Sequence, residues 1–315
     1  MVSGISVGHC DQAHQDGASN MLSYEDEARK LERKLRQYAE RLFYSSFASK
    51  LLTIVVGVIA SFFAQLTDIV SLVMLVLYLL SELLLFLHQN VRGDWEYLQR
   101  RLDALNSLGW PIPNKQMSDL STEYSRLLNK SETLKPHHAE YFASTAPIGE
   151  LRALQNTQES AWYAKHIAKA TFRIYLGLIG ALVIVAMVAL SFVIITANDL
   201  SAVVGATRGA IAGFTLLVSV NLFTFTLGYN AYARCADLIE SNIAALLDSG
   251  SYTQEDAIRI MNEYHLCHAS APMNPSWIWK WKRTTLGVSW NTYRRELGGA
   301  SDYVGKTDLG VSRRD

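Results

Sequence analysis

The chain has 315 residues, a formal net charge of zero and 50% hydrophobic residues. A water-soluble domain would spread its apolar residues along the chain in periodic stripes, but here they gather in two blocks, residues 51–87 and 174–229. All of the 29 Lys and Arg residues except Arg208 lie outside these blocks. This composition excludes an ordinary soluble domain and makes the lipid bilayer the first expected partner.

Each apolar block is too long for one bilayer crossing and suits two, because a spanning helix needs ~20 apolar residues. Basic residues stay on the cytoplasmic side, so both termini and the middle of the chain should face the cytoplasm. The sequence therefore predicts an all-α integral membrane protein with four spans in two hairpins and a helical cytoplasmic region. The expected spans are about 51–66, 69–87, 174–196 and 203–229.

The first residues, 1–22, are polar and predict a disordered tail without a cleavable signal peptide. Residues 23–109 form a predicted helix–hairpin–helix unit. Its first helix begins near Ser23 and buries Leu31 and Leu35 on one face. Its last helix, 94–108, should end at Gly109, since glycine favours the helix C-terminus.

A cytoplasmic connecting segment is expected over 110–149, with a short helix at 118–128. A second helix–hairpin–helix unit follows over 150–250, in which a helix runs from Glu150 without a breaker into the third span and a later helix ends at Gly250. We expect a cytoplasmic helical segment over 251–297, with helices at 254–264 and 275–297. Residues 298–315 are expected to form a tail. The similar halves fit either duplication of a two-span unit or the shared physics of hairpins.

The fourth predicted span carries glycines at every fourth position. Without a Cβ, such positions let two helix backbones approach closely in a membrane. The partner helix is either span three of the same chain or span four of another copy, which would make the protein a homo-oligomer. The glycines are Gly205, Gly209 and Gly213.

Polar residues of the same span fall on one helical face, because they step by seven and four. They serve either interhelical hydrogen bonding or, in an oligomer, the lining of a pore. The stripe consists of Arg208, Thr215, Ser219, Thr226 and Asn230, flanked by Asn221. Glu82, in the second span, is either a proton or cation site or an interfacial charge near His88 and Arg92.

Tryptophans and bases gather near the C-terminus. Such a mixture suits an interfacial helix at the headgroups, and it also suits stacking on a nucleotide and holding its phosphates. The residues are Trp277, Lys280, Trp281, Lys282, Arg283, Arg294 and Arg295.

No catalytic motif is present in the sequence, so we expect no enzyme, no cofactor and no metal site. Cys10, Cys235 and Cys267 all fall in predicted cytoplasmic parts, where we expect reduced thiols. No DNA or RNA polymer is expected as a partner.

The layout and three stretches of sequence resemble bacterial SMODS-associated four-transmembrane (4TM) pore-forming effectors, which are encoded beside cyclic-oligonucleotide synthases in antiphage defence. The likeness covers roughly residues 25–297. The stretches are Trp95-Glu96-Tyr97-Leu98, then Tyr141–Ser144 through Pro147 to Gln158–Trp162, and Pro275-Ser276-Trp277-Ile278 with Arg283.

This resemblance implies a function that the composition does not show. Such effectors sense a nucleotide signal made on infection and then disrupt the inner membrane of their own cell. The resemblance therefore implies a cyclic oligonucleotide as the ligand and the bacterial inner membrane as the location of this chain. The alternative is a housekeeping ion channel or small-solute transporter of the same membrane, which would carry flux in unstressed cells.

Overall fold

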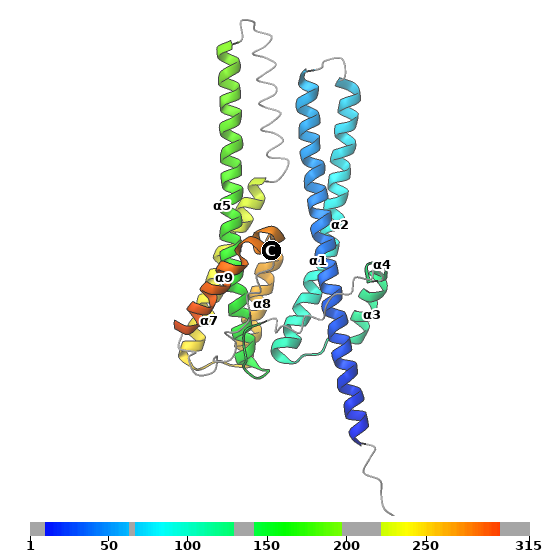
Figure 1. The fold of residues 1–315 in the computed structure, drawn as a ribbon, viewed down its shortest axis with the longest axis vertical. Coiled ribbons are helices and arrows are strands. Elements are labelled where there is room, and N and C mark those ends of the chain that lie inside the picture. The colour runs from blue at the N-terminus through cyan, green and yellow to red at the C-terminus, as the bar shows by residue number, and fades with distance from the viewer. Residues whose placement is uncertain (1–9, 63–66, 129–141, 197–221, 297–315) are drawn as a thin grey trace, which may run out of the picture. The chain divides into compact units, whose positions relative to one another are not determined.

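The computed structural model describes residues 10–62, 67–128, 142–196 and 222–296. All regular structure in these ranges is α-helical, with no strand, which confirms the predicted all-α class. The helices are α1 (Cys10–Phe62), α2 (Thr67–Leu108), α3 (Asn114–Glu123), α4 (Ser125–Leu128), α5 (Glu150–Thr196), α7 (Leu222–Ser249), α8 (Gln254–Ser270) and α9 (Ser276–Glu296), as labelled in Figure 1.

The chain divides into two compact units. The first comprises residues 1–44 and 83–140, and the second comprises residues 45–82 and 141–315. The division passes through α1 and α2, so the charged parts of these helices belong to the first unit and their apolar parts to the second.

Long uninterrupted helices join the polar and apolar parts of the chain. The predicted continuation of the helix from Glu150 into the third apolar stretch is confirmed, because α5 runs unbroken over 47 residues to Thr196. The second apolar stretch and the predicted helix 94–108 form one helix, α2. Gly109 and Gly250 follow α2 and α7 with φ of 71° and 64°, as predicted for glycine at a helix end.

Three helix boundaries differ from those predicted. Helix α1 begins at Cys10 rather than near Ser23, because no proline interrupts this stretch and one glycine costs a helix only ~1 kcal/mol. The predicted helix 118–128 is two helices, α3 and α4, which meet at Tyr124. Helix α8 continues beyond Tyr264 to Ser270, because burial of its last two turns stabilises them.

The first unit is held together by the faces of α1 and α2 that the sequence predicted. Leu31 and Leu35 of α1 and Leu98 of α2 are fully buried, and each such side chain contributes about 1.5–3 kcal/mol to folding. Trp95 donates its indole N–H to Glu32 Oε1 at 2.6 Å. His88 Nδ1 lies 2.9 Å from the carbonyl oxygen of Ala39.

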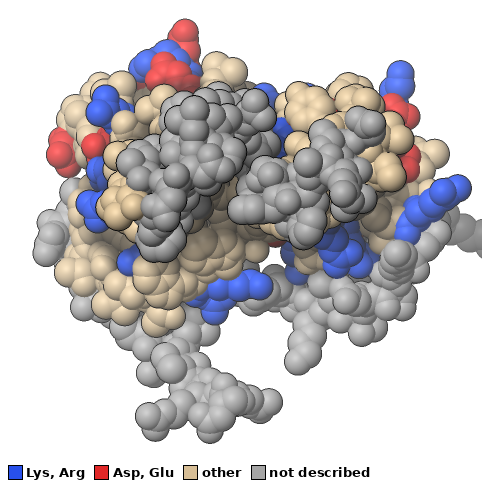
Figure 2. Space-filling view, turned by 90° about the horizontal axis from the view of Figure 1, so that it is seen from above, with Lys and Arg blue, Asp and Glu red and all other residues tan. Residues whose placement is uncertain are grey.

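The apolar part of α2 exposes its side chains instead of burying them. From Ile69 on, α2 is the one helix of the described residues that is long and apolar enough to cross a membrane, with a mean hydropathy of 2.5 in its most apolar window, of which 6% is buried. Ile69, Leu72 and Leu79 are each about 60% exposed. A helix in the core of a soluble protein would be mostly buried, so this surface fits lipid. In the view along the long helices, much of the described surface carries neither Lys, Arg, Asp nor Glu (Figure 2).

Within the second unit, polar side chains connect the apolar parts of α1 and α2. Ser46 and Ser49 of α1 donate to the carbonyl oxygens of Ser81 and Leu77 of α2, each at 2.9 Å. Lys50 Nζ lies 2.9 Å from Glu82 Oε1. The sequence did not indicate this partner for Glu82. The Lys50 side chain is 8% exposed and the Glu82 side chain 43% exposed, so the buried lysine depends more strongly on the ion pair.

We predict that Glu82→Gln destabilises the protein by about 3 kcal/mol, because it leaves the buried ammonium of Lys50 unpaired. Lys50→Met should cost less, since Glu82 is near one end of the predicted span and its side chain, 43% exposed, can still reach interfacial water. In a double-mutant cycle of unfolding in detergent, the two residues should show a coupling of roughly 0.5–3 kcal/mol. Strictly additive losses would show that the pair does not connect the two helices.

Candidate functional site

Helices α5, α7, α8 and α9 form the helical cluster that carries the candidate site. Helix α9 docks on α5 through a buried cluster of Trp162, Ile167, Ile278, Leu286 and Trp290. The ring centroids of Trp162 and Trp290 are 5.3 Å apart, and those of Tyr163 and Trp279 are 5.4 Å apart. Aromatic pairs at this separation add about 0.5–1.5 kcal/mol each to their burial, so α9 is fixed in place by its apolar face.

A lysine of α5 connects that helix to two carboxylates of α7. Lys165 Nζ lies 3.0 Å from Asp237 Oδ1 and also donates to Glu240 Oε2. Lys169 Nζ lies 3.7 Å from Asp237 Oδ2. Burial alone would lower the pKa of Lys165, but its hydrogen bonds to Glu240 and Asp237 raise that pKa above the ordinary value. The hydrogen bond from Lys165 holds the pKa of Asp237 below its ordinary value of 3.8.

The segment between α8 and α9 is fixed against α7. The hydroxyl of Tyr229, which is fully buried, donates to the carbonyl oxygen of Met273 at 2.6 Å. Gly228 lies so close to Pro272 that a Cβ at this position would be 2.7 Å from the proline Cγ. The missing side chain of Gly228 therefore allows the close approach of this segment and positions the start of α9.

Two cysteines of this cluster meet between α7 and α8. The sulfur atoms of Cys235 and Cys267 are in contact, and their Cα atoms are 6.4 Å apart, which lies within the range that a disulfide spans. The expectation of separate thiols is therefore wrong for these two residues. Their separation of 32 positions in the chain gave no sign of the pairing.

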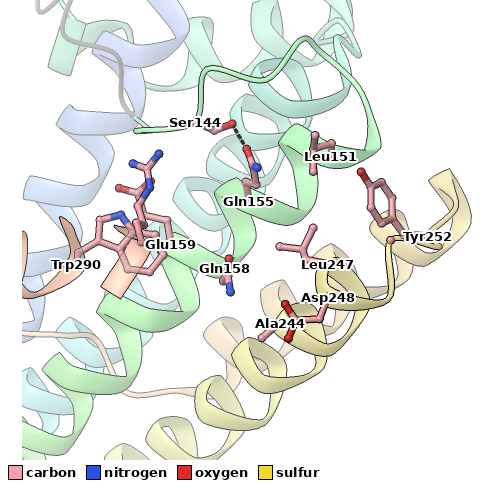
Figure 3. Close-up of a pocket in the computed structure, with 12 residues that line it drawn as sticks. Ser144, Leu151, Gln155, Gln158, Glu159, Ala244, Leu247, Asp248, Tyr252 and Trp290 are labelled. Atoms are coloured by element: carbon pink, nitrogen blue, oxygen red, sulfur yellow. Dashed lines mark hydrogen bonds between the residues drawn. The ribbon is translucent and has the colours of Figure 1, made fainter. Parts of the chain in front are cut away.

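A cavity of about 290 Å³ opens between α5, α7 and α9 (Figure 3). A loop before α5 forms part of its wall and is held by hydrogen bonds to α5 and α9. The Ala143 N–H donates to Glu159 Oε2 at 3.0 Å, and Arg294 Nη2 donates to the Ala143 carbonyl oxygen at 3.1 Å. Ser144 Oγ donates to Gln155 Oε1 at 2.6 Å. The lining residues are Ser144, Leu151, Gln155, Gln158, Glu159, Ala244, Leu247, Asp248, Gly250, Tyr252, Trp290 and Arg294.

Two residues of the lining each carry a side-chain N–H that is buried within the protein and has no hydrogen-bond partner. Gln158 is 5% exposed and Trp290 is 4% exposed, yet neither Gln158 Nε2 nor Trp290 Nε1 has a hydrogen-bond partner. A buried polar group without a partner costs about 1–3 kcal/mol. Burial also raises the pKa of the Glu159 carboxyl, although the Ala143 N–H and Arg294 act in the opposite direction.

Most of the residues predicted for the fourth span cannot be placed. Gly205, Gly209 and Gly213, and with them Arg208, Thr215, Ser219 and Asn221, lie outside the described residues. Thr226 is buried in α7 and donates to the carbonyl oxygen of Leu222 at 2.7 Å in its own helix. Asn230 is half-buried.

The tryptophans and bases predicted as one group are divided by α9. Trp277 and Trp281 are 50% and 60% exposed, Lys280 and Arg283 are exposed beside them, and the Lys282 ammonium lies 4.3 Å from the Trp281 ring centroid. Arg294 instead lines the cavity, and Arg295 is near the end of α9. The sequence missed the cavity because its residues come from segments that are far apart in the chain.

No family model, no curated protein and no solved structure matches this chain. The resemblance to SMODS-associated four-transmembrane effectors therefore stays a prediction.

We predict that Asp237→Asn lowers the melting temperature near neutral pH but has no effect in acid. A carboxylate whose pKa is lowered by folding stabilises the protein above its unfolded pKa, and this contribution is lost as pH falls through the folded pKa. The melting temperatures of the wild type and the variant in detergent should therefore converge below about pH 4. A difference that persists to pH 2 would contradict this role.

We predict that Gly228→Ala destabilises the protein by roughly 1–3 kcal/mol, because its new methyl group would overlap Pro272. Gly287→Ala in α9 is the matched control, since a Cβ there meets nothing within 4 Å and alanine favours a helix by about 1 kcal/mol. In thermal unfolding, Gly228→Ala should lower the melting temperature and Gly287→Ala should raise it. Equal effects would mean that the approach of Pro272 to α7 is not close.

Proposed function

We propose that this chain is an effector of the bacterial inner membrane that self-associates and permeabilises or depolarises the membrane when a cytosolic signal reaches its helical cytoplasmic region. The chain crosses the bilayer four times in this proposal, with both termini in the cytoplasm. The signal that the family resemblance implies is a cyclic oligonucleotide, and the response is antiphage defence.

The observation that carries the membrane part is the exposed apolar surface of α2. The same property extends to α5, where Ile184, Val188 and Ile195 are 64%, 64% and 81% exposed, and to α1, where Leu52 and Val55 are about half exposed. Side chains of this kind are stable in lipid and unfavourable in water. The charged segments of the same helices favour an aqueous phase, so each helix should pass from water into lipid.

The exposed face of α9 supports a position of the cytoplasmic region close to the bilayer. Trp277 and Trp281 are four residues apart and both exposed, so they lie on one face, with the exposed bases Lys280 and Arg283 alongside. Tryptophan favours the headgroup level, and basic side chains favour anionic lipids. The segment before α9 is also fixed to Tyr229, where the predicted fourth span ends.

Self-association rests on the predicted glycine ladder of span four. Close backbone packing through Gly209 and Gly213 would bring copies of the chain together and place the polar stripe that includes Thr215 and Ser219 at their junction. Such a junction is a path for ions once the helices separate or rotate.

We predict that the purified protein in liposomes releases a trapped dye when a cyclic oligonucleotide from a panel is added, and that it releases little without one. Gly209→Leu with Gly213→Leu should abolish the release, because the larger side chains prevent close helix packing. Gly180→Leu in α5 is the control, since its Cβ meets nothing within 4 Å.

Dye release or ion flux of equal rate with and without every cyclic oligonucleotide would favour the housekeeping channel. Absence of release under all conditions, in protein shown to be folded and inserted, would contradict the proposed function. A tag at residue 1, 130 or 315 that a periplasmic probe reaches in intact cells would contradict the topology.

A further inference from the structure

Helix α9 has two faces, and only one of them packs on the protein. Ile278, Leu286 and Trp290 form the buried face, which docks on α5. Trp277 and Trp281 lie on a different face and are 50% and 60% exposed, and they are neighbours because residues four apart lie one above the other on a helix. Two large apolar side chains exposed side by side mark an interaction surface.

The charge of α9 indicates that the partner of this surface is anionic. The helix carries five bases, and its one acid, Glu296, is its last residue. Lys280 and Arg283 are exposed beside the two tryptophans, and the Lys282 ammonium lies 4.3 Å from the Trp281 ring centroid. Trp277, Lys280, Trp281 and Arg283 together are called the outer patch of α9. Tryptophans interleaved with bases are typical of a surface that meets anionic lipid headgroups.

Two contacts place the start of α9 at the level where α5 and α7 become apolar. Tyr229, the last residue of the predicted fourth span, donates to the carbonyl oxygen of Met273. Ile174, the first residue of the predicted third span, packs against the buried cluster that includes Ile278. The ring centroids of Tyr175 and Tyr229 are 5.5 Å apart, so α5 and α7 reach this level together.

The course of α9 brings only its first turns to this level. Figure 1 shows α9 starting beside the middle of α5 and running toward the N-terminal end of α5. The outer patch occupies these first turns, so it lies where the proposed bilayer has its headgroups, and the later turns of α9 lie farther from the lipid.

We propose that the outer patch of α9 binds the phosphate groups of anionic lipids. Trp277 and Trp281 lie between the headgroups, and Lys280 and Arg283 donate to lipid phosphate oxygens, as bases in such positions do. No bond is made or broken. This inference rests on the membrane part of the proposed function and adds the class of lipid that the cytoplasmic helices bind.

The distribution of tryptophans in the chain makes a direct test possible. None of them lies in the four predicted spans, and the exposed ones of the described residues are Trp110, Trp277 and Trp281. The full-length protein in micelles of a neutral detergent is titrated with phosphatidylglycerol whose acyl chains carry bromine, which quenches the fluorescence of a tryptophan that it contacts. Brominated phosphatidylglycerol should quench at a lower mole fraction than brominated phosphatidylcholine. Equal quenching by the two lipids would overturn the proposal.

The exposed tryptophans give matched variants. Trp277→Phe combined with Trp281→Phe should remove most of the quenching by phosphatidylglycerol. Trp110→Phe is the control, because this residue is also exposed, at 40%, but lies outside α9, and its replacement should leave the quenching unchanged. Quenching that survives the double replacement would show that the lipid binds elsewhere.

The bases are tested in the same titration. Lys280→Gln and Arg283→Gln should each raise the mole fraction of half-maximal quenching about fivefold, the contribution of one base near an anionic surface. Arg259→Gln in α8 is the control, since its side chain is 55% exposed and its loss changes the net charge equally. Equal shifts in all three variants would assign the effect to overall charge and overturn the site.

Glycerol phosphate separates a lipid from a soluble anion, because it supplies the phosphate without acyl chains. At matched ionic strength it should not reverse the quenching, and reversal would assign the outer patch to a soluble phosphate. No preference for phosphatidylglycerol, in a protein that alkaline carbonate does not extract from membranes, would remove this site and leave the proposed function standing. A protein that prefers phosphatidylglycerol but releases no dye would keep this site and lose the effector function.

Discussion

The free energy needed to remove a charge from water governs the structure of this protein. A charged side chain at the centre of a bilayer costs at least ~2.5–3.5 kcal/mol, and the sequence keeps almost all of its Lys and Arg residues out of its two apolar blocks. At the edge of the first block, Lys50 is paired with Glu82, which lies inside it. The same cost applies among helices α5, α7, α8 and α9, where Lys165, whose side chain is 14% exposed, is paired with two carboxylates. These ion pairs of Lys50 and Lys165 lie where two helices meet.

The packing of helices α5, α7, α8 and α9 is specified by large side chains and by one glycine that has no side chain. Trp162, Trp290 and Ile278 fix α9 against α5, and Gly228 admits Pro272 against α7. These contacts leave Trp277 and Trp281 on the outer face of α9 and place Trp290 and Arg294 in the cavity. One short helix therefore contributes both a surface suited to lipid headgroups and a wall of the candidate site.

The sequence predicted the elements whose signals are local. Continuous apolar stretches and glycines at helix ends were sufficient for the long helix α5 and for the ends of α2 and α7. The buried face of α1, with Leu31 and Leu35, followed from helical spacing. Features that depend on distant segments were missed, namely the contact of Cys235 with Cys267, the partner of Glu82, and the cavity. Single-sequence patterns contain no signal for such pairings, because neither residue changes the local periodicity that reveals a helix.

The unbroken course of α5 has a mechanical consequence. Its first turns carry Gln158 and Glu159 at the cavity, and the helix then continues without a break to Thr196, a distance of about 55 Å at 1.5 Å per residue. Over such a lever arm, a tilt of only ~5° at one end displaces the other by about 5 Å. A rigid rod of this kind converts a small adjustment of side chains at the cavity into a larger displacement of its apolar end.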